Sequence, residues 1–183
     1  QNVVRNAQMT FYMIKNISTI TLFLIVTIPM LHGQDTTQLK RTPYKLKVVV
    51  DKKTSYEEDI KETPYVLPDN TIQLYPGETV FIEIDQTDGL IKGVKAVEKI
   101  KDPTRTLTIS FTQSVNKKVH ELMILKVTNP FALKLSYKTL IFPLYQKKWV
   151  NTNVYPVESG LSGLETWPDI ITSIALGNWT FQK

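Results

Sequence analysis

His120 is the one histidine after residue 33, and most hydrolytic or metal-dependent chemistry in this chain would have to use it. It lies beside Glu121 in a largely apolar segment, and the chain has no cysteine. A zinc site needs several ligands of the His, Cys or carboxylate type, and a serine hydrolase needs a histidine paired with its nucleophile. Because no further histidine or cysteine accompanies His120, we expect it to be a polar residue on the face of a strand.

Two runs of carboxylates are the remaining candidates for acid–base or metal chemistry. Residues 57–59 are Glu-Glu-Asp, and Glu83, Asp85 and Asp88 lie at a predicted strand end and turn. Glycosidases use paired carboxylates, and Ca²⁺ takes carboxylate oxygens as ligands. Adjacent like charges are typical of a solvated loop, however, and the second run lacks the spacing of a calcium loop. We therefore expect no catalytic residues, no metal and no cofactor, and predict that the protein is not an enzyme.

Residues 160–168 (GLSGLETWP) are a stronger candidate for ligand binding, because they combine flexible glycines with the acid Glu165 and the aromatic Trp167. An exposed tryptophan beside an acid can stack against the apolar face of a sugar. The alternative is that Trp167 closes one end of the domain, with its indole N–H bonded to the backbone. The sequence leaves both interpretations open.

A second aromatic and basic segment comprises Tyr145, Lys147, Lys148 and Trp149. Tyr145 and Trp149 could contribute to the same kind of ligand site. The alternative is an edge strand that its lysines protect against pairing with another sheet. The exposure of Trp149 and Trp167 decides between the interpretations.

The composition is that of a globular protein, with 42% hydrophobic and 21% charged residues over 183 positions. The lack of cysteine excludes disulfides, thiolate metal sites and lipid attachment through a cysteine. The formal charge of +5 is small and the lysines are scattered, whereas nucleic-acid-binding proteins concentrate basic residues on one face. We therefore expect no nucleic-acid partner.

Residues 13–33 have the pattern of a cleavable secretory signal, formed as a hydrophobic helix. The segment begins with one positive charge, residues 17–31 carry none, and a glycine precedes the expected cut. The apolar run is shorter than the ~20 residues of a membrane-spanning helix, so no stable membrane insertion is expected after cleavage; the alternative is an uncleaved anchor. We interpret residues 1–12 as an upstream extension and residues 34–43 as a flexible leader. The sequence thus predicts a bacterial protein exported to the periplasm, the cell surface or the extracellular space.

Residues 44–183 are predicted to form a single all-β domain. Alternation of apolar and polar residues predicts strands, and Pro, Gly, Asn and Asp mark the turns between them. The alternation is strictest in residues 106–112, where Leu107, Ile109 and Phe111 are expected to point inward. Seven to nine antiparallel strands with no crossover helix favour a β-sandwich over a closed barrel.

Local signals predict several details within this domain. The sequence Tyr75-Pro-Gly-Glu predicts a type II turn between the strands of a hairpin. The spacing of residues 90–100 fits a strand with a bulge at Gly93 or a short helix, and the β-branched residues favour the strand. A bulge is also indicated at Gly177 in the last strand. Residues 51–63 are charged and lack a clean period, so we expect a long loop or a short helical turn.

Two passages resemble exported bacterial proteins. Residues 121–131 (ELMILKVTNPF), followed by Leu135-Ser-Tyr-Lys, resemble the strand, Asn-Pro-aromatic turn and strand of immunoglobulin-like sandwich domains. Residues 160–168, with a closing strand that ends Asn178-Trp-Thr-Phe, are similar to uncharacterised secreted proteins of Bacteroidota-type bacteria. The resemblance covers roughly residues 119–183. It implies an antiparallel immunoglobulin-like β-sandwich and an exported location, and it brings no catalytic or binding residues with it.

These observations predict a non-catalytic exported cell-envelope domain that acts as an interaction or structural module, with an unidentified protein or glycan as its partner. The alternative function is a module that binds carbohydrate or another ligand through exposed aromatics. Its candidate site residues are Trp167, Glu165, Trp149 and Tyr145.

Overall fold

The computed structural model describes residues 38–182. The expected extension 1–12, the expected signal 13–33 and the first residues of the expected leader 34–43 lie outside the described part. The described residues are all-β, with antiparallel strands and no helix. The strands are β1 (Tyr44–Val49), β2 (Ser55–Ile60), β3 (Ile72–Leu74), β4 (Glu78–Thr87), β5 (Leu90–Val97), β6 (Thr106–Asn116), β7 (Val119–Thr128), β8 (Lys134–Pro143), β9 (Val150–Thr152), β10 (Ser162–Trp167) and β11 (Ile171–Gln182).

No helix within residues 38–182 has the length and hydropathy needed to cross a membrane.

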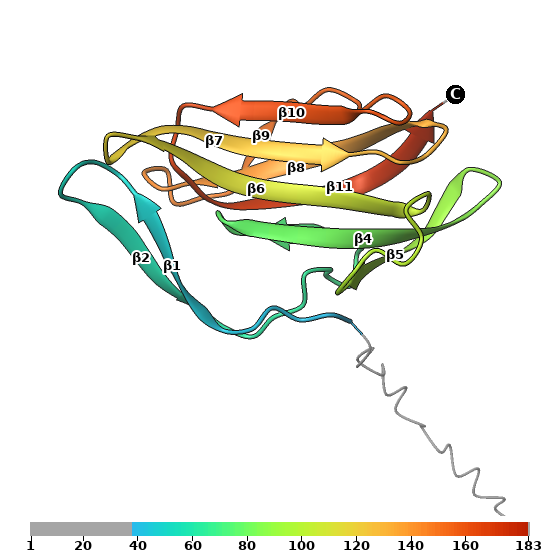
Figure 1. The fold of residues 1–183 in the computed structure, drawn as a ribbon, viewed down its shortest axis with the longest axis horizontal. Helices are drawn as coiled ribbons and strands as arrows, with labels where there is room; N and C mark the ends of the chain where they lie inside the picture. Colours follow the sequence, from blue (N-terminus) through green and yellow to red (C-terminus); the bar gives the residue numbers. More distant parts are fainter. Residues whose placement is uncertain (1–37, 183) are drawn as a thin grey trace, which may run out of the picture. The chain divides into compact units, whose positions relative to one another are not determined.

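Two larger sheets share one buried core. The five-stranded sheet has the order β10-β7-β6-β4-β5, and the four-stranded sheet has the order β3-β11-β8-β9. Figure 1 shows them as two layers. Side chains of both sheets are fully buried in the core, among them Ile82 and Leu125 of the first sheet and Leu74 and Ile174 of the second. Apolar burial between the sheets is therefore the main force that holds this fold together.

The strictest sequence pattern is confirmed. Leu107, Ile109 and Phe111 of β6 have no exposed surface. The bulges also form where the glycines predicted them. The register of β4 against β5 shifts next to Gly93, and the register of β11 against β8 shifts after Gly177.

The predicted turn at residues 75–78 forms, but it does not close a hairpin. The Glu78 N–H donates to the Tyr75 carbonyl at 3.1 Å, and Gly77 has the positive φ of 96° that a type II turn requires. However, β3 pairs with β11, whereas β4 pairs with β5 and β6. The turn therefore carries the chain from one sheet to the other. The hairpin prediction was wrong. Apolar and polar residues alternate in the same way in two strands that pair with each other and in two strands that lie in opposite sheets around one core, so the pattern does not distinguish the two cases.

Strands β1 and β2 form a separate two-stranded sheet. Leu46, Val48 and Ile60 on one of its faces join Ile170 in a second, smaller core. Residues 51–63 were expected to form a loop or a helical turn, but β2 lies within them. Residues 38–182 contain eleven strands, more than the predicted seven to nine, because β2 and β10 were not recognised as strands.

The domain begins earlier than the sequence predicted. Lys40 forms an isolated antiparallel bridge with Pro64, and Arg41 is almost completely buried. Both residues belong to the segment 34–43 that we expected to be a flexible leader. They are part of the folded domain because the Arg41 side chain forms a buried ion pair with Glu78.

Candidate functional site

Trp149 and Phe142 form an aromatic pair on the solvent side of the four-stranded sheet. Phe142 is near the end of β8 and Trp149 directly precedes β9, which pairs with β8 through Ile141 and Val150. The two ring centroids are 5.4 Å apart at an interplanar angle of 71°, which is the favoured edge-to-face geometry. Trp149 remains 42% exposed. Its ring is thus held in place by a neighbour while a large part of it faces water.

The turn that precedes Trp149 is fixed by hydrogen bonds to the end of β8. The Pro143 carbonyl accepts from Gln146 N at 3.2 Å and from Lys147 N at 3.1 Å. Lys147 completes the turn with a positive φ of 51°. This turn leaves Tyr145 75% exposed.

We call the surface made by Phe142, Tyr145, Lys147, Lys148 and Trp149 the aromatic surface. Its exposed indole can stack against a flat apolar group, and the preceding turn carries a tyrosine hydroxyl and two ammonium groups that can donate hydrogen bonds. This combination suits a sugar ring, which has an apolar face and a rim of hydroxyls. Of the predicted site residues, Tyr145 and Trp149 lie on this surface.

Trp167 and Glu165 have different surroundings. They lie on β10, so the predicted flexible loop of residues 160–168 is largely a strand. The Trp167 indole N–H donates to Thr152 Oγ1 at 3.1 Å, and Tyr155 N donates to Glu165 Oε1 at 2.8 Å. These bonds join β10, at the edge of one sheet, to the segment around β9, at the edge of the other.

We call this junction the β9–β10 seam. Trp167 is half-buried and packs against the main core. The geometry therefore favours the interpretation in which Trp167 closes the domain, although its indole N–H bonds a threonine hydroxyl rather than the backbone. Trp167 and Glu165 make contacts at the seam, whereas Trp149 and Tyr145 keep much of their surface exposed to water.

Both ring nitrogens of His120 lie within hydrogen-bond distance of other protein groups. Its Nε2 lies 3.0 Å from the Pro168 carbonyl, and its Nδ1 lies 3.0 Å from the Gln113 side-chain amide nitrogen. Gln113 in turn pairs with both backbone groups of Val49 in β1, at 2.9 and 2.7 Å. His120 therefore helps Gln113 to hold the β1–β2 sheet against the five-stranded sheet.

The first carboxylate run, residues 57–59, also has local partners. Glu57 lies 3.6 Å from the Lys45 ammonium and 3.3 Å from that of Lys47 across the β1–β2 sheet. Glu58 accepts a hydrogen bond of 2.6 Å from the Tyr56 hydroxyl. Within the described residues, no group of three or more His, Cys, Asp or Glu side chains could hold a metal ion.

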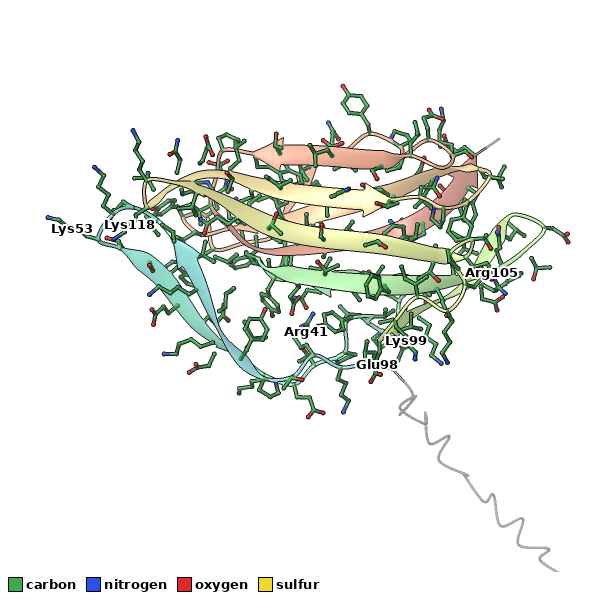
Figure 2. The ribbon with its side chains drawn as sticks, in the orientation of Figure 1. Arg41, Lys53, Glu98, Lys99, Arg105 and Lys118 are labelled. Carbon is green, nitrogen blue, oxygen red and sulfur yellow. The ribbon has the colours of Figure 1, made fainter. Side chains whose placement is uncertain are left out.

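Two acids of the second run, Glu83 and Asp85, border a cavity of about 460 Å³ beside β4 and β5. Glu83, Asp85 and Asp102 line it together with the cations Lys95 and Arg105, of which Arg105 lies in the loop that follows β5 (Figure 2). Asp85 and Arg105 are 3.9 Å apart. The sequence pointed to the acids near positions 83–88 but not to the opposing cations. Lys95 comes opposite Glu83 only through the pairing of β4 with β5, and Arg105 approaches Asp85 from the loop after β5.

Arg41 is at the centre of a buried polar cluster that the sequence did not indicate (Figure 2). Its Nε donates to Glu78 Oε1 at 2.9 Å, and both side chains are nearly inaccessible to water, with exposures of 1% and 7%. The guanidinium carbon lies 4.6 Å from the centre of the Tyr65 ring and 5.1 Å from that of the Tyr75 ring. Tyr44 donates to Glu78 Oε1 at 3.1 Å. We call these five residues the Arg41 cluster, and interpret it as the link between the first described residues and the larger sheets.

The tyrosines around this cluster predict that the protein loses stability in alkali. Burial, followed by the Glu78 carboxylate, raises the pKa of Tyr44 above its ordinary value of 10.0, and burial is also the main cause that raises the pKa values of Tyr65 and Tyr75. Burial and the hydrogen bond to Glu58 raise the pKa of Tyr56 to about 12. Folding therefore favours the protonated phenols, so their contribution is complete below pH 10 and is lost as the pH rises toward the folded pKa values.

Urea unfolding at a series of alkaline pH values measures this effect. We expect the free energy of unfolding to fall above pH 10, and to fall less steeply in Tyr44→Phe, which removes one of the raised phenols. Tyr145→Phe is the control, because that phenol is largely exposed; its pH profile should match the wild type. A stability that stays constant through the tyrosine titration would contradict the prediction.

Comparisons of the chain with protein-family models, with curated proteins and with solved structures found no match. The resemblance to immunoglobulin-like exported proteins of Bacteroidota-type bacteria therefore stays a prediction. The function is inferred from the positions and contacts of the residues described above.

Proposed function

We propose that this protein is a non-catalytic, exported cell-envelope domain that acts as an interaction module, and that its contact surface is the aromatic surface. The half-exposed Trp149, held edge-to-face by Phe142, is the observation that carries the proposal. A tryptophan that serves only to fill a core has no reason to keep 42% of its surface in water. The engagement of His120 with Gln113 and Pro168 supports a role other than catalysis for the histidine.

Carbohydrate is the ligand class that this surface favours. An indole presented on the face of a sheet is flat and rigid, so stacking of a sugar on it costs little side-chain entropy. Tyr145, Lys147 and Lys148 lie in the adjoining turn and supply hydrogen-bond donors for hydroxyl or acidic groups of a glycan. A glycan partner also agrees with the export that residues 13–33 indicate, since an exported bacterial protein meets polysaccharides in the periplasm and at the surface.

We further propose that the two larger sheets form a β-sandwich. The shared core supports this architecture. The strand orders differ from the ABED and CFG orders of an immunoglobulin constant domain. The likeness that we propose to immunoglobulin-like domains is therefore one of layered architecture, without the same strand order.

Replacing Trp149 with alanine is expected to weaken glycan binding strongly. Central aromatic contacts contribute about 2 kcal/mol or more, so the dissociation constant should rise at least about thirtyfold. Isothermal titration calorimetry of the full chain against a panel of neutral and acidic polysaccharides measures this effect, because it does not require the tryptophan as a fluorophore.

Two control variants make the experiment specific. Trp149→Phe keeps an aromatic ring at the same position and should retain part of the affinity. Trp167→Phe removes the hydrogen bond to Thr152 at the seam, so it should lower stability and leave glycan affinity unchanged. The proposal fails if no polysaccharide of the panel binds, or if Trp149→Ala binds as tightly as the wild type.

A further inference from the structure

β10 is an edge strand without the usual protection. It pairs with β7 through residues Ser162 to Trp167, and within residues 38–182 no strand pairs with its other side. An edge strand presents a row of unpaired N–H and C=O groups to any other strand that approaches. Natural proteins block such edges with charged side chains, above all lysine, and with proline, bulges or very short strands. The sequence of β10, SGLETW, contains neither lysine nor proline, and its register against β7 has no bulge. Its one charged side chain, Glu165, accepts a hydrogen bond from Tyr155 N at the seam.

The other edges of the two larger sheets are blocked in these ways. β5 has a bulge opposite Asp85 and Gln86, and it carries Lys92 and Lys95. β9 has only three residues and follows Lys147 and Lys148.

β3 has only three residues as well, and its outer side is covered by the segment that precedes it. Gln73 N donates to the Tyr65 carbonyl at 3.0 Å, and the Gln73 carbonyl accepts from the buried Arg41 at 2.8 Å. Of the four edges of the larger sheets in the described part, β10 alone remains open to an added strand.

The side chains around this edge are apolar and exposed. Leu164, in the middle of β10, is 63% exposed on the solvent face of the sheet. Leu161, directly before the strand, and Tyr155, whose N–H bonds Glu165, are also exposed. The β9–β10 seam holds the opposite face of the strand through Glu165 and Trp167. The edge is therefore rigid and in position before any partner arrives.

We propose that β10 pairs with β10 of a second copy of this chain, antiparallel and centred on Leu164. In this register Leu164 faces its counterpart, Ser162 faces Thr166, and Gly163 faces Glu165. The two exposed leucines then cover each other, the hydroxyls of Ser162 and Thr166 meet, and neither carboxylate opposes a like charge.

The second copy is the occupant that these features favour. The contact is isologous, since the same residues serve on both sides, so it closes after two subunits instead of growing into a fibre. It joins the two five-stranded sheets into one continuous sheet. The free main-chain groups of both edges become paired, as in strand addition generally. The interface uses β10, whereas glycan binding uses the turn between β8 and β9, so either proposal can fail without the other.

Leu164→Lys is the first test. Two lysines would face each other at the centre of the interface, so we expect the dissociation constant of the dimer to rise at least about tenfold. Leu90→Lys is a matched control, because Leu90 is also an exposed leucine at 63% but lies on β5. Sedimentation equilibrium of the three full chains, from about 1 µM to about 1 mM, gives the molecular mass in each case. The wild type and Leu90→Lys should dimerise alike.

Cysteine substitution supplies a second measurement that does not depend on a loss of binding. The chain contains no cysteine, so a single introduced thiol can form a disulfide only between molecules. Opposed residues in an antiparallel pair have Cα atoms about 4.5–5.5 Å apart, within the range that a disulfide spans. Leu164→Cys should therefore form a covalent dimer under mild oxidation at least about tenfold faster than Leu90→Cys.

Two results would overturn the proposal. One is a wild-type chain that is monomeric at every concentration tested, which would leave β10 free for a strand of a different protein. The other is equal cross-linking of Leu164→Cys and Leu90→Cys, which would mean that any association uses another surface.

Discussion

Replacing Arg41 with alanine is expected to lower the free energy of unfolding by about 3–5 kcal/mol, because removal of one partner leaves the other charge buried and unpaired. Glu78 would keep only the Tyr44 hydroxyl and the Tyr75 N–H as donors. The substitution also removes the bond from Arg41 to the Gln73 carbonyl at 2.8 Å and the cation–π contacts of the guanidinium with the Tyr65 and Tyr75 rings. Equilibrium unfolding in urea, monitored by far-UV circular dichroism, measures the loss.

Lys40→Ala is the matched control for this experiment. Lys40 is the neighbouring cation and is 2.9 Å from Glu62, but both side chains are more than half exposed. Exposed ion pairs contribute little, so the change should stay within about 0.5 kcal/mol. A loss in Arg41→Ala no larger than that in Lys40→Ala would contradict the role assigned to the Arg41 cluster.

The double variant Arg41→Met/Glu78→Leu separates burial from charge. Apolar side chains of similar volume remove both charges at once, and buried ion pairs are often replaced in this way with little loss of stability. We expect the double variant to be more stable than Arg41→Ala. If it is less stable, the hydrogen bonds of the cluster contribute more than the unpaired charge costs.

Replacing Asn129 with alanine is expected to lower the free energy of unfolding by about 3 kcal/mol, because several buried backbone groups lose their partner. Asn129 is completely buried. Its side-chain nitrogen donates to the carbonyls of Leu133 at 2.8 Å, Val157 at 3.0 Å and Glu158 at 3.2 Å. Its side-chain oxygen accepts from Phe131 N at 3.0 Å. One side chain thus ties the turn between β7 and β8 to the segment that leads into β10.

Thermal and urea unfolding of Asn129→Ala measure this contribution. Asn151→Ala is the control, because Asn151 is an exposed asparagine on β9, where a substitution should change stability by no more than about 0.5 kcal/mol. Asn129→Asp adds a further comparison. It keeps the acceptor for Phe131 N but replaces a donor with a buried charge, so it should be at least as destabilising as alanine. Equal stabilities of the Asn129 and Asn151 variants would exclude the role proposed for Asn129.

The Asn129-Pro130 dipeptide predicts a turn but not the burial of its asparagine. The dipeptide predicts a turn, because both residues favour turn conformations, and the turn between β7 and β8 forms there. The asparagine is buried because its side chain bonds the carbonyls of Val157 and Glu158. These residues are 28 and 29 positions further along the chain. No local pattern contains that information.

β2 and β10 were missed for related reasons. The sequence of β2, SYEEDI, is too charged to look like a strand, but Glu57 is paired with Lys45 and Lys47 of β1. β10 contains a glycine that suggested a loop. In the fold that glycine is required, since a Cβ atom at Gly163 would lie 2.7 Å from Val157 Cγ2. In each case the deciding residue belongs to another segment.

Local sequence patterns were sufficient to predict the β-class of this domain, the inward faces of strands such as β6, the type II turn at residues 75–78 and the bulges beside Gly93 and Gly177. These features depend on neighbours within a few positions, where side-chain alternation and backbone sterics act directly. The tertiary structure alone decided that β3 and β4 belong to different sheets and that Arg41 is buried. It also decided that Trp149 faces water while Trp167 closes the seam. Exposure is a property of what the rest of the chain packs against, so the residues next to each tryptophan in the sequence did not decide its surroundings.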